Sequence, residues 1–275
     1  MSENGTSIAV ISPQGGAIRQ LSINDFEIVP AFSLDSARKY VYGNTLAPWP
    51  NRLQDATFEF RGEQFCFDDL DAQNNKNHGL LLSEVFEVRE HSRERLVLGY
   101  RFGHHAGYPF EIDLQVSFVL TESALEVEAK ATNHGNAAPF AIGFHPYFLT
   151  GQEFELNANV TGRSVQNERM LPIGVDAIDS LTLTQHSEEL GSLDHCFVGG
   201  NQVMLTRPEG AVVVEALENL PYFMMYRPSD ALASAGPLIA IEPQSSMANV
   251  FRDDIESVVL ERAETKNYRF AIRKL

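Results

Sequence analysis

The segments FEIDLQVSFVL (Phe110–Leu120) and LEVEAKAT (Leu125–Thr132) decide the fold class of this chain. In both, apolar and polar residues alternate, which is the pattern of a strand with one buried and one solvated face. AVVVEAL (Ala211–Leu217) is a third short apolar segment of this kind, and turn-forming residues separate such segments. Many strands separated by turns at intervals of about ten residues indicate a sandwich or barrel. We therefore predict an all-β fold, a large antiparallel β sandwich with few short helices.

Helical periodicity is weak throughout the sequence. Only two segments allow a short helix, SLDSARKYV (33–41) and LDHCFVGG (193–200). The segment 170–197 looks poor in strands, and we expect it to form an irregular excursion over one end of the sheets, of the kind that often binds ligands. Linkers, tandem repeats and low-complexity stretches are not evident, so residues 1–275 are interpreted as a single domain.

The charge of the chain limits its partners. The 275 residues carry a formal net charge of -16, and 44% of them are hydrophobic, which is enough for a sizeable core. Nucleic acids and anionic membranes attract positive charge, so neither is an expected partner. The same acidity weighs mildly against a strongly anionic ligand.

The cysteines and the first thirty residues suggest a cell compartment. Cys66 and Cys196 are far apart and in no CxxC arrangement, which argues against a disulfide framework or a zinc site. The first thirty residues lack the pattern of a secretory signal, and no apolar run is long enough to span a membrane. We expect a soluble cytoplasmic protein.

Several common catalytic motifs are missing from the sequence. It has no GxGxxG after a strand, no Walker-type loop, no HExxH and no GxSxG. The adjacent His104 and His105 would point to opposite faces of a strand, which makes them a poor metal pair. Five histidines lie in polar surroundings and are interpreted as surface residues: His91, His104, His105, His134 and His186.

The stretch GFHPYF (Gly143–Phe148) places a histidine directly before a proline. The residue before proline is biased toward extended geometry, so His145 is expected on a strand or at a strand end, among aromatic neighbours. An imidazole held in this way suits proton transfer near neutral pH. A half-buried histidine that only fills space would give the same pattern.

The stretch LIAIEPQSS (Leu238–Ser246) repeats this arrangement with an acid. Glu242 ends an apolar run and precedes Pro243, so we expect it to be extended and partly desolvated, which raises a carboxyl pKa and makes a better base. The alternative is a structural glutamate, salt-bridged to Arg52 or Arg227. Taken singly, each residue is more often structural than catalytic. An acid and a histidine that both precede a proline make the catalytic interpretation of the two together stronger.

Three further stretches carry polar groups suited to ligand binding. APWPNRL puts Asn51 and Arg52 after a proline-rich corner, where a guanidinium can hold a hydroxyl or a carboxylate. NHGLL puts His78 before a glycine at an expected loop-to-strand junction. LDHCF offers Asp194 as a hydrogen-bond acceptor.

The stretches PNRL, HGLL, GFHPYF, LDHCF and IEPQ, in this order and at these separations, resemble the aldose 1-epimerase (galactose mutarotase) family. The resemblance covers roughly residues 42–250. It implies a galactose mutarotase-like supersandwich with an open cleft across one sheet.

The resemblance also implies an activity, the interconversion of the α and β anomers of a hexose such as galactose or glucose. Glu242 would be the general base that takes the anomeric proton, and His145 the general acid that protonates the ring oxygen. No cofactor, metal, nucleotide or covalent intermediate is implied. The residues implied in binding the sugar are Arg52, His78, Asp194 and Asn51.

Departures from the family pattern put the sugar in doubt. GFHPYF lacks the asparagine and the threonine that flank the histidine in many members, so the chain is interpreted as a divergent member of the family. Its expected partner is a small monosaccharide. We expect the protein to be a monomer or a homodimer. One alternative is a mutarotase for a phosphorylated or sulfonated hexose, with cations from Arg89, Arg207 and Arg227. The other is a non-catalytic carbohydrate-binding protein on the same fold. Four aromatic residues could supply the apolar face of the site, although core packing is the usual fate of such residues: Trp49, Phe144, Tyr147 and Phe223.

Overall fold

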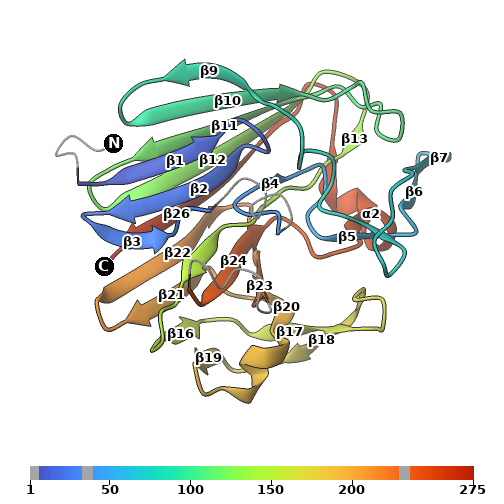
Figure 1. Ribbon diagram of the computed structural model, residues 1–275. Coiled ribbons are helices and arrows are strands. Elements are labelled where there is room, and N and C mark those ends of the chain that lie inside the picture. Colours follow the sequence, from blue (N-terminus) through green and yellow to red (C-terminus); the bar gives the residue numbers. More distant parts are fainter. Residues whose placement is uncertain (1–5, 33–39, 229–235) are drawn as a thin grey trace.

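The computed structural model describes residues 6–32, 40–228 and 236–275, and antiparallel strands dominate it (Figure 1). The fold is the expected all-β sandwich, with two large sheets and several small ones. The short helix expected at 33–41 falls mainly on residues 33–39, which lie outside the described residues.

The larger sheet has nine strands, and its centre combines segments from distant parts of the chain. β26 (Thr265–Lys274) pairs on one side with β12 (Ala124–Asn133) and on the other with β22 (Gly210–Glu218). The segments that predicted the fold form β11 (Ile112–Leu120), β12 and β22, as expected. The remaining strands are β9 (Glu87–His91), β10 (Arg95–Arg101), β16 (Glu155–Ala158), β19 (Leu181–Thr184) and β21 (Gln202–Arg207).

The second large sheet carries β24 (Leu238–Gln244), which is buried along its whole length. Its strands run in the order β18, β17, β20, β23, β24, β14, β4, and β15 also pairs with β24. The bounds of its other strands are β18 (Pro172–Ala177), β17 (Gly162–Gln166), β20 (Asp194–Val198), β23 (Tyr222–Tyr226), β14 (Gly143–Phe144), β4 (Thr45–Leu46) and β15 (Tyr147–Leu149).

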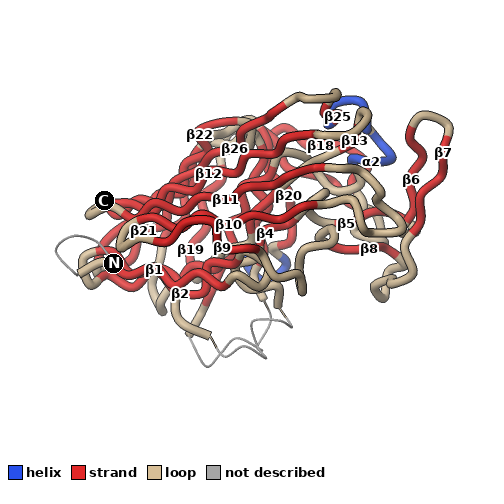
Figure 2. Tube along the Cα trace, turned by 90° about the horizontal axis from the view of Figure 1, so that it is seen from above, coloured by secondary structure: helices blue, strands red, loops and turns tan. Residues whose placement is uncertain are grey.

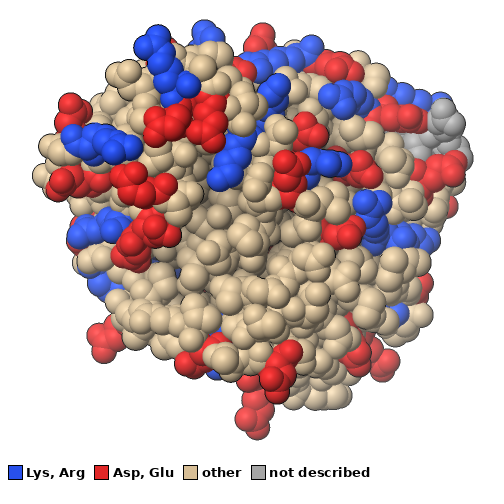
Figure 3. Space-filling model, turned by 180° about the vertical axis from the view of Figure 1, so that it is seen from behind, with Lys and Arg blue, Asp and Glu red and all other residues tan. Residues whose placement is uncertain are grey.

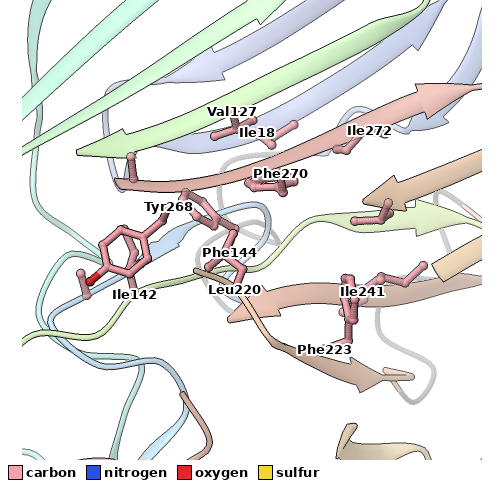
Figure 4. Packing of buried hydrophobic residues seen from close by; sticks show 14 of the residues in the cluster. Ile18, Val127, Ile142, Phe144, Leu220, Phe223, Ile241, Tyr268, Phe270 and Ile272 are labelled. Carbon is pink, nitrogen blue, oxygen red and sulfur yellow. The ribbon is translucent and has the colours of Figure 1, made fainter. Parts of the chain in front are cut away.

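The hydrophobic core lies between the two large sheets. Phe144 of β14 meets Phe270 of β26 with ring centroids 4.8 Å apart. Phe223 and Ile241 lie nearby on neighbouring strands, and none of the four is more than 1% exposed (Figure 4). One face of the eight-stranded sheet is therefore committed to the core, which leaves its other face for a site.

Small elements complete the fold. The helices are short, and in the part of the chain that the structure describes none is long and apolar enough to cross a membrane (Figure 2). Their bounds are η1 (Glu188–Ser192), α2 (Val250–Asp253) and η3 (Ile255–Val258). The small sheets are formed by β1 (Ile8–Ser12), β2 (Ala17–Ile23) and β3 (Phe26–Val29), by β5 (Arg52–Gln54) and β8 (Asn75–Asn77), by β6 (Thr57–Phe60) and β7 (Glu63–Cys66), and by β13 (Ala138–Pro139) and β25 (Val259–Leu260).

Two expectations about the segment 170–197 and its surroundings were wrong. Residues 193–200 do not form a helix; β20 occupies 194–198 and is followed by Gly199, which has φ +81°. The segment 170–197 is not poor in strands either, because it contains β18, β19 and the start of β20. The sequence pattern of β18 was misleading because five of its six residues are exposed at the sheet edge and show no alternation.

Charged residues of both signs are interspersed on the face shown in Figure 3, around a broad uncharged area. On this face the acidic residues do not gather in one patch.

Candidate functional site

The register of three strands aligns the site on the face of the eight-stranded sheet that points away from the core. Met224 of β23 lies opposite Cys196 of β20 on one side and opposite Glu242 of β24 on the other. Tyr226 lies opposite Asp194 in the next row. Residues directly opposite each other share a face of a sheet, as do residues two apart along a strand. Asp194 and Glu242 therefore project to the same side.

His145 lies between β14 and β15, and backbone hydrogen bonds hold it from both sides. Its amide N donates to the carbonyl of Asn44 (3.0 Å), and its own carbonyl accepts from the amide of Gly43 (2.9 Å). The imidazole stacks on Tyr147, with ring centroids 4.9 Å apart, and meets His78 edge-on at 5.3 Å. The ring is only 5% exposed, which matches the rigid placement expected from the following proline.

Glu242 and His145 are in direct contact. His145 Nε2 lies 3.3 Å from Glu242 Oε1, and the second oxygen, Oε2, accepts a hydrogen bond of 3.0 Å from Gln244 Nε2. Glu242 is 1% exposed and lies inside β24, not at the strand end that the sequence suggested. The alternative partners weighed for this carboxylate, Arg52 and Arg227, form no ion pair with it among the described residues.

Asn51 and His78 hold each other at the edge of the β5–β8 ribbon. The amide of Asn51 donates to His78 Nδ1 (3.3 Å), and the amide of His78 donates to the Asn51 carbonyl (2.8 Å). His78 follows β8, so the expected loop-to-strand junction is in fact a strand end. A Cβ at Gly79 would lie 2.2 Å from the Ala47 carbonyl oxygen, which explains the glycine after the histidine.

Arg52 spans the mouth of the site. Its Nη2 lies 3.8 Å from Asp194 Oδ2, its Nε lies 4.0 Å from Asp71 Oδ2, and its Nη1 donates to Asn51 Oδ1 at 3.2 Å. The guanidinium is mostly buried, whereas about a quarter of the Asp194 side chain is exposed. The guanidinium thus presents hydrogen-bond donors next to carboxylate acceptors, a combination that can bind a hydroxyl group beside them.

The six candidate site residues line one cavity of about 300 Å³: Asn51, Arg52, His78, His145, Asp194 and Glu242. The sequence did not single out six further lining residues, because side chains of these kinds are common throughout the chain: Tyr40, Val41, Asn77, Leu82, Met224 and Tyr226. Of the four aromatic residues considered for the site, only Tyr147 lines the cavity; Trp49, Phe144 and Phe223 are buried in the core.

Burial shifts the pKa values of Glu242 and His145. It raises the pKa of Glu242 well above the ordinary value, and the nearby Asp194 carboxylate raises it further. Burial lowers the pKa of His145 to about 4, and burial together with the neighbouring His145 and Arg52 lowers the pKa of His78. Over the pH range between these two pKa values the pair of Glu242 and His145 thus holds one proton, and the two shifts favour the carboxyl group as its place in the free protein.

The arginines considered for an anionic sugar lie elsewhere. Arg89 is engaged by Asp113 through two hydrogen bonds of 2.9 and 2.6 Å. Arg207 donates to backbone carbonyls and packs over Phe26, with the guanidinium carbon 4.2 Å from the ring centroid. Neither these two nor Arg227 lines the cavity.

His104 and His105 do not point to opposite faces of a strand. They follow β10 in a loop, and both Nε2 atoms reach the hydroxyl of Tyr100, at 3.1 and 2.8 Å. Over the described ranges, no group of three or more His, Cys, Asp or Glu residues is arranged to hold a metal ion.

Comparisons with known proteins agree with this architecture. The model of the family described as "Aldose 1-epimerase" matches residues 1–273. The chain is 26% identical over 280 residues to the uncharacterized protein YihR of Escherichia coli, covering 96% of this chain and 89% of that one.

Two solved structures show the same fold. The GalM/aldose epimerase homologue from C. elegans has a TM-score of 0.86 at 18% identity, covering 100% of this chain and 97% of that one. The galactose 1-epimerase from Lactobacillus acidophilus has a TM-score of 0.84 at 18% identity, covering 100% and 92%.

Proposed function

The chain belongs to the aldose 1-epimerase family of isomerases, and we propose that it interconverts the α and β anomers of a free hexose such as galactose or glucose. The observation that carries the proposal is the 3.3 Å contact between His145 Nε2 and Glu242 Oε1 in the wall of the cavity. The anomeric hydroxyl and the ring oxygen of a pyranose are bonded to the same carbon, so two groups this close can serve both.

Ring opening needs one proton removed and another supplied. Glu242 takes the proton of the anomeric hydroxyl, and His145 gives a proton to the ring oxygen as the bond between C1 and that oxygen breaks. The aldehyde turns about the C1–C2 bond, and the reverse transfers close the ring on the other face. The pair holds one proton before and after the cycle, so it is ready again without a further reactant.

The resting proton must first move from Glu242 to His145. The Arg52 guanidinium favours this transfer because its charge lowers the pKa of Glu242. Sugar hydroxyls that bind between Arg52, Asp194 and Asn51 displace water from the site, which strengthens that attraction. His78, whose pKa is lowered, stays neutral and offers one ring nitrogen to the sugar.

The test is anomer exchange measured by NMR on a panel of hexoses and pentoses, at a pH where spontaneous mutarotation is slow. We expect wild-type protein to accelerate the exchange of at least one neutral sugar. Glu242→Gln should lower kcat/KM by about 10²–10⁴-fold. Sugar binding by the variant, measured by calorimetry, should persist because the amide keeps the size of the carboxyl.

The other outcomes identify the alternatives. If the protein accelerates anomer exchange only for phosphorylated or sulfonated hexoses, its substrate is an anionic hexose and not a neutral one. Binding of sugars without any acceleration would identify a non-catalytic carbohydrate-binding protein. The single domain, the monomeric or homodimeric state and the cytoplasmic location remain predictions from sequence.

A further inference from the structure

Arg169 does not line the catalytic cavity; it lies in the hairpin between β17 and β18 (Figure 1) and binds residues 71–75, which lead into β8 and are called the β8 loop below. Its Nε donates to the carbonyl of Gln73 (3.0 Å), and its Nη2 donates to the carbonyl of Asn74 (2.7 Å). Asn75, the first residue of β8, contacts it twice: Oδ1 accepts from Nη2 at 3.2 Å, and Nδ2 donates to the Arg169 carbonyl at 3.0 Å. One arginine therefore fixes three consecutive residues of the β8 loop.

The same guanidinium also binds the end of the strand that carries Arg52. Arg169 Nη2 donates to Oδ1 of Asp55 (2.8 Å), the residue that follows β5. The amide of Asp55 donates to the Asn74 carbonyl (3.0 Å), which the guanidinium binds as well. β5 and β8 pair as an antiparallel ribbon. Arg169 thus closes one end of this ribbon, and the other end carries Arg52 and His78 at the cavity.

Asp71 connects the β8 loop to the Arg52 side chain. Its Oδ1 accepts hydrogen bonds from the amides of Gln73 (2.9 Å) and Asn75 (2.8 Å), which fix the direction of the carboxylate. Its Oδ2 lies 4.0 Å from Arg52 Nε, a buried atom that has no hydrogen-bond partner among the described residues. Asp71 thus attracts the guanidinium at Nε while Asp194 attracts it at Nη2, so a displacement of the β8 loop would displace Arg52 as well.

We propose that Arg169 is a positioning residue of the catalytic site, which holds Arg52 and His78, through the β8 loop, where they bind the sugar. This proposal rests on the proposed function. Glu242 and His145 are held by other strands of the eight-stranded sheet and do not depend on the β8 loop for their backbone positions. Loss of Arg169 should therefore raise KM by a larger factor than it lowers kcat.

The experiment compares Arg169→Gln with Arg163→Gln in NMR anomer exchange of the neutral sugar that wild-type protein turns over fastest. Both arginines belong to the β17–β18 hairpin, and their side chains are 32% and 34% exposed, but Arg163 forms an ion pair with the exposed Glu189 at 3.6 Å. Arg169→Gln should raise KM about three- to tenfold and lower kcat less than threefold. Arg163→Gln should change KM and kcat less than twofold.

The KM value separates positioning from a simple loss of folded protein. A variant that is only less stable has a lower concentration of active enzyme and so a lower apparent kcat, while its folded molecules keep the wild-type KM. Arg169→Lys keeps the charge but not the planar fork of donors, so its KM should lie between those of wild type and Arg169→Gln. An unchanged KM in Arg169→Gln, or an equal rise of KM in Arg163→Gln, would overturn the proposal.

A second measurement does not depend on turnover. Burial, the neighbouring His145 and the Arg52 charge all lower the pKa of His78, so the ring resonances of His78 depend on where Arg52 lies. These resonances, assigned with His78→Gln, should shift in the imidazole NMR spectrum of Arg169→Gln and stay in place in Arg163→Gln.

The two measurements distinguish the failure of this proposal from the failure of the proposed function. If wild-type protein turns over no sugar, the proposed function fails, and a shift of the His78 resonances in Arg169→Gln still supports the role of Arg169 in placing the ribbon. If the protein turns over a sugar and the His78 resonances stay in place in Arg169→Gln, the positioning role is overturned and the mutarotase stands.

Discussion

The molecule contains two histidine pairs, and their surroundings make them chemically different. His104 and His105 are adjacent in sequence, with ring centroids 4.3 Å apart, and both bind the Tyr100 hydroxyl at the surface. His78 and His145 are far apart in sequence, with centroids 5.3 Å apart; both are buried, and His145 contacts Glu242. Burial is the largest cause of the lowered pKa of His78 and of His145, and it acts in the same direction on the half-buried ring of His105.

Removing one histidine from each pair is the strongest way to break this comparison. His145→Gln should lower kcat/KM for anomer exchange by about 10²–10⁴-fold, because the group that protonates the ring oxygen is lost. His105→Gln removes an imidazole of equal size and should change kcat/KM less than twofold. An effect of similar size in both variants would contradict the assignment of the active pair.

The pH profile of kcat/KM sharpens the comparison. In the proposed mechanism the pair of Glu242 and His145 acts with one proton and is inactive with two, and burial lowers the pKa of His145 to about 4. Activity should therefore hold down to the region of pH 4 and then fall about tenfold per pH unit, as the pair takes up its second proton. If kcat/KM instead falls with a midpoint near pH 6.5, a histidine with an ordinary pKa limits the rate.

At the alkaline end the pair loses its only proton. Because the pKa of Glu242 is raised well above the ordinary value, this limb should lie above the pH at which an exposed glutamate ionises. Stopped-flow polarimetry across the pH range measures both limbs in one series.

Gln244 provides the smallest of the expected effects. Its hydrogen bond to Oε2 favours the ionised carboxylate and lowers the pKa of Glu242, so Gln244→Leu should raise that pKa. We expect kcat to fall about tenfold and the alkaline limb to move to higher pH, since loss of the last proton becomes harder.

Gln202→Leu is a suitable control for this variant, because Gln202 is exposed on β21. A loss of kcat in Gln244→Leu without any movement of the limb would mean that Gln244 supports the fold alone.

The sequence predicted the sandwich well, because strands such as β11 and β12 have one buried and one solvated face and so alternate visibly. It failed at β18, where an exposed edge strand has no alternation, and at β20, where a short apolar run before Gly199 and Gly200 resembled a helix end. The partner of β18 is β17, its neighbour in the chain, so exposure at the sheet edge explains that failure. β20 pairs with β17 and β23, from which other chain segments separate it, and local pattern does not record such pairing.

For the candidate site, the sequence indicated the residues but not their geometry. Arg52, His78, His145, Asp194 and Glu242 all line one cavity, although their catalytic and binding roles remain proposals. The contact between His145 and Glu242 depends on two strands meeting, and the tyrosines of the wall had no distinguishing pattern. Only tertiary structure selects Tyr226 from among the other tyrosines.

The position of β26 has a consequence for synthesis of the protein. This strand comes after every other strand in the chain, yet it joins the two halves of the nine-stranded sheet. A nascent chain stalled before residue 265 would leave β12 and β22 as unpaired edges, which attract other chains. Synthesis must therefore pass residue 274 before the nine-stranded sheet can close, and chaperones that shield exposed edges are expected to bind the chain until then.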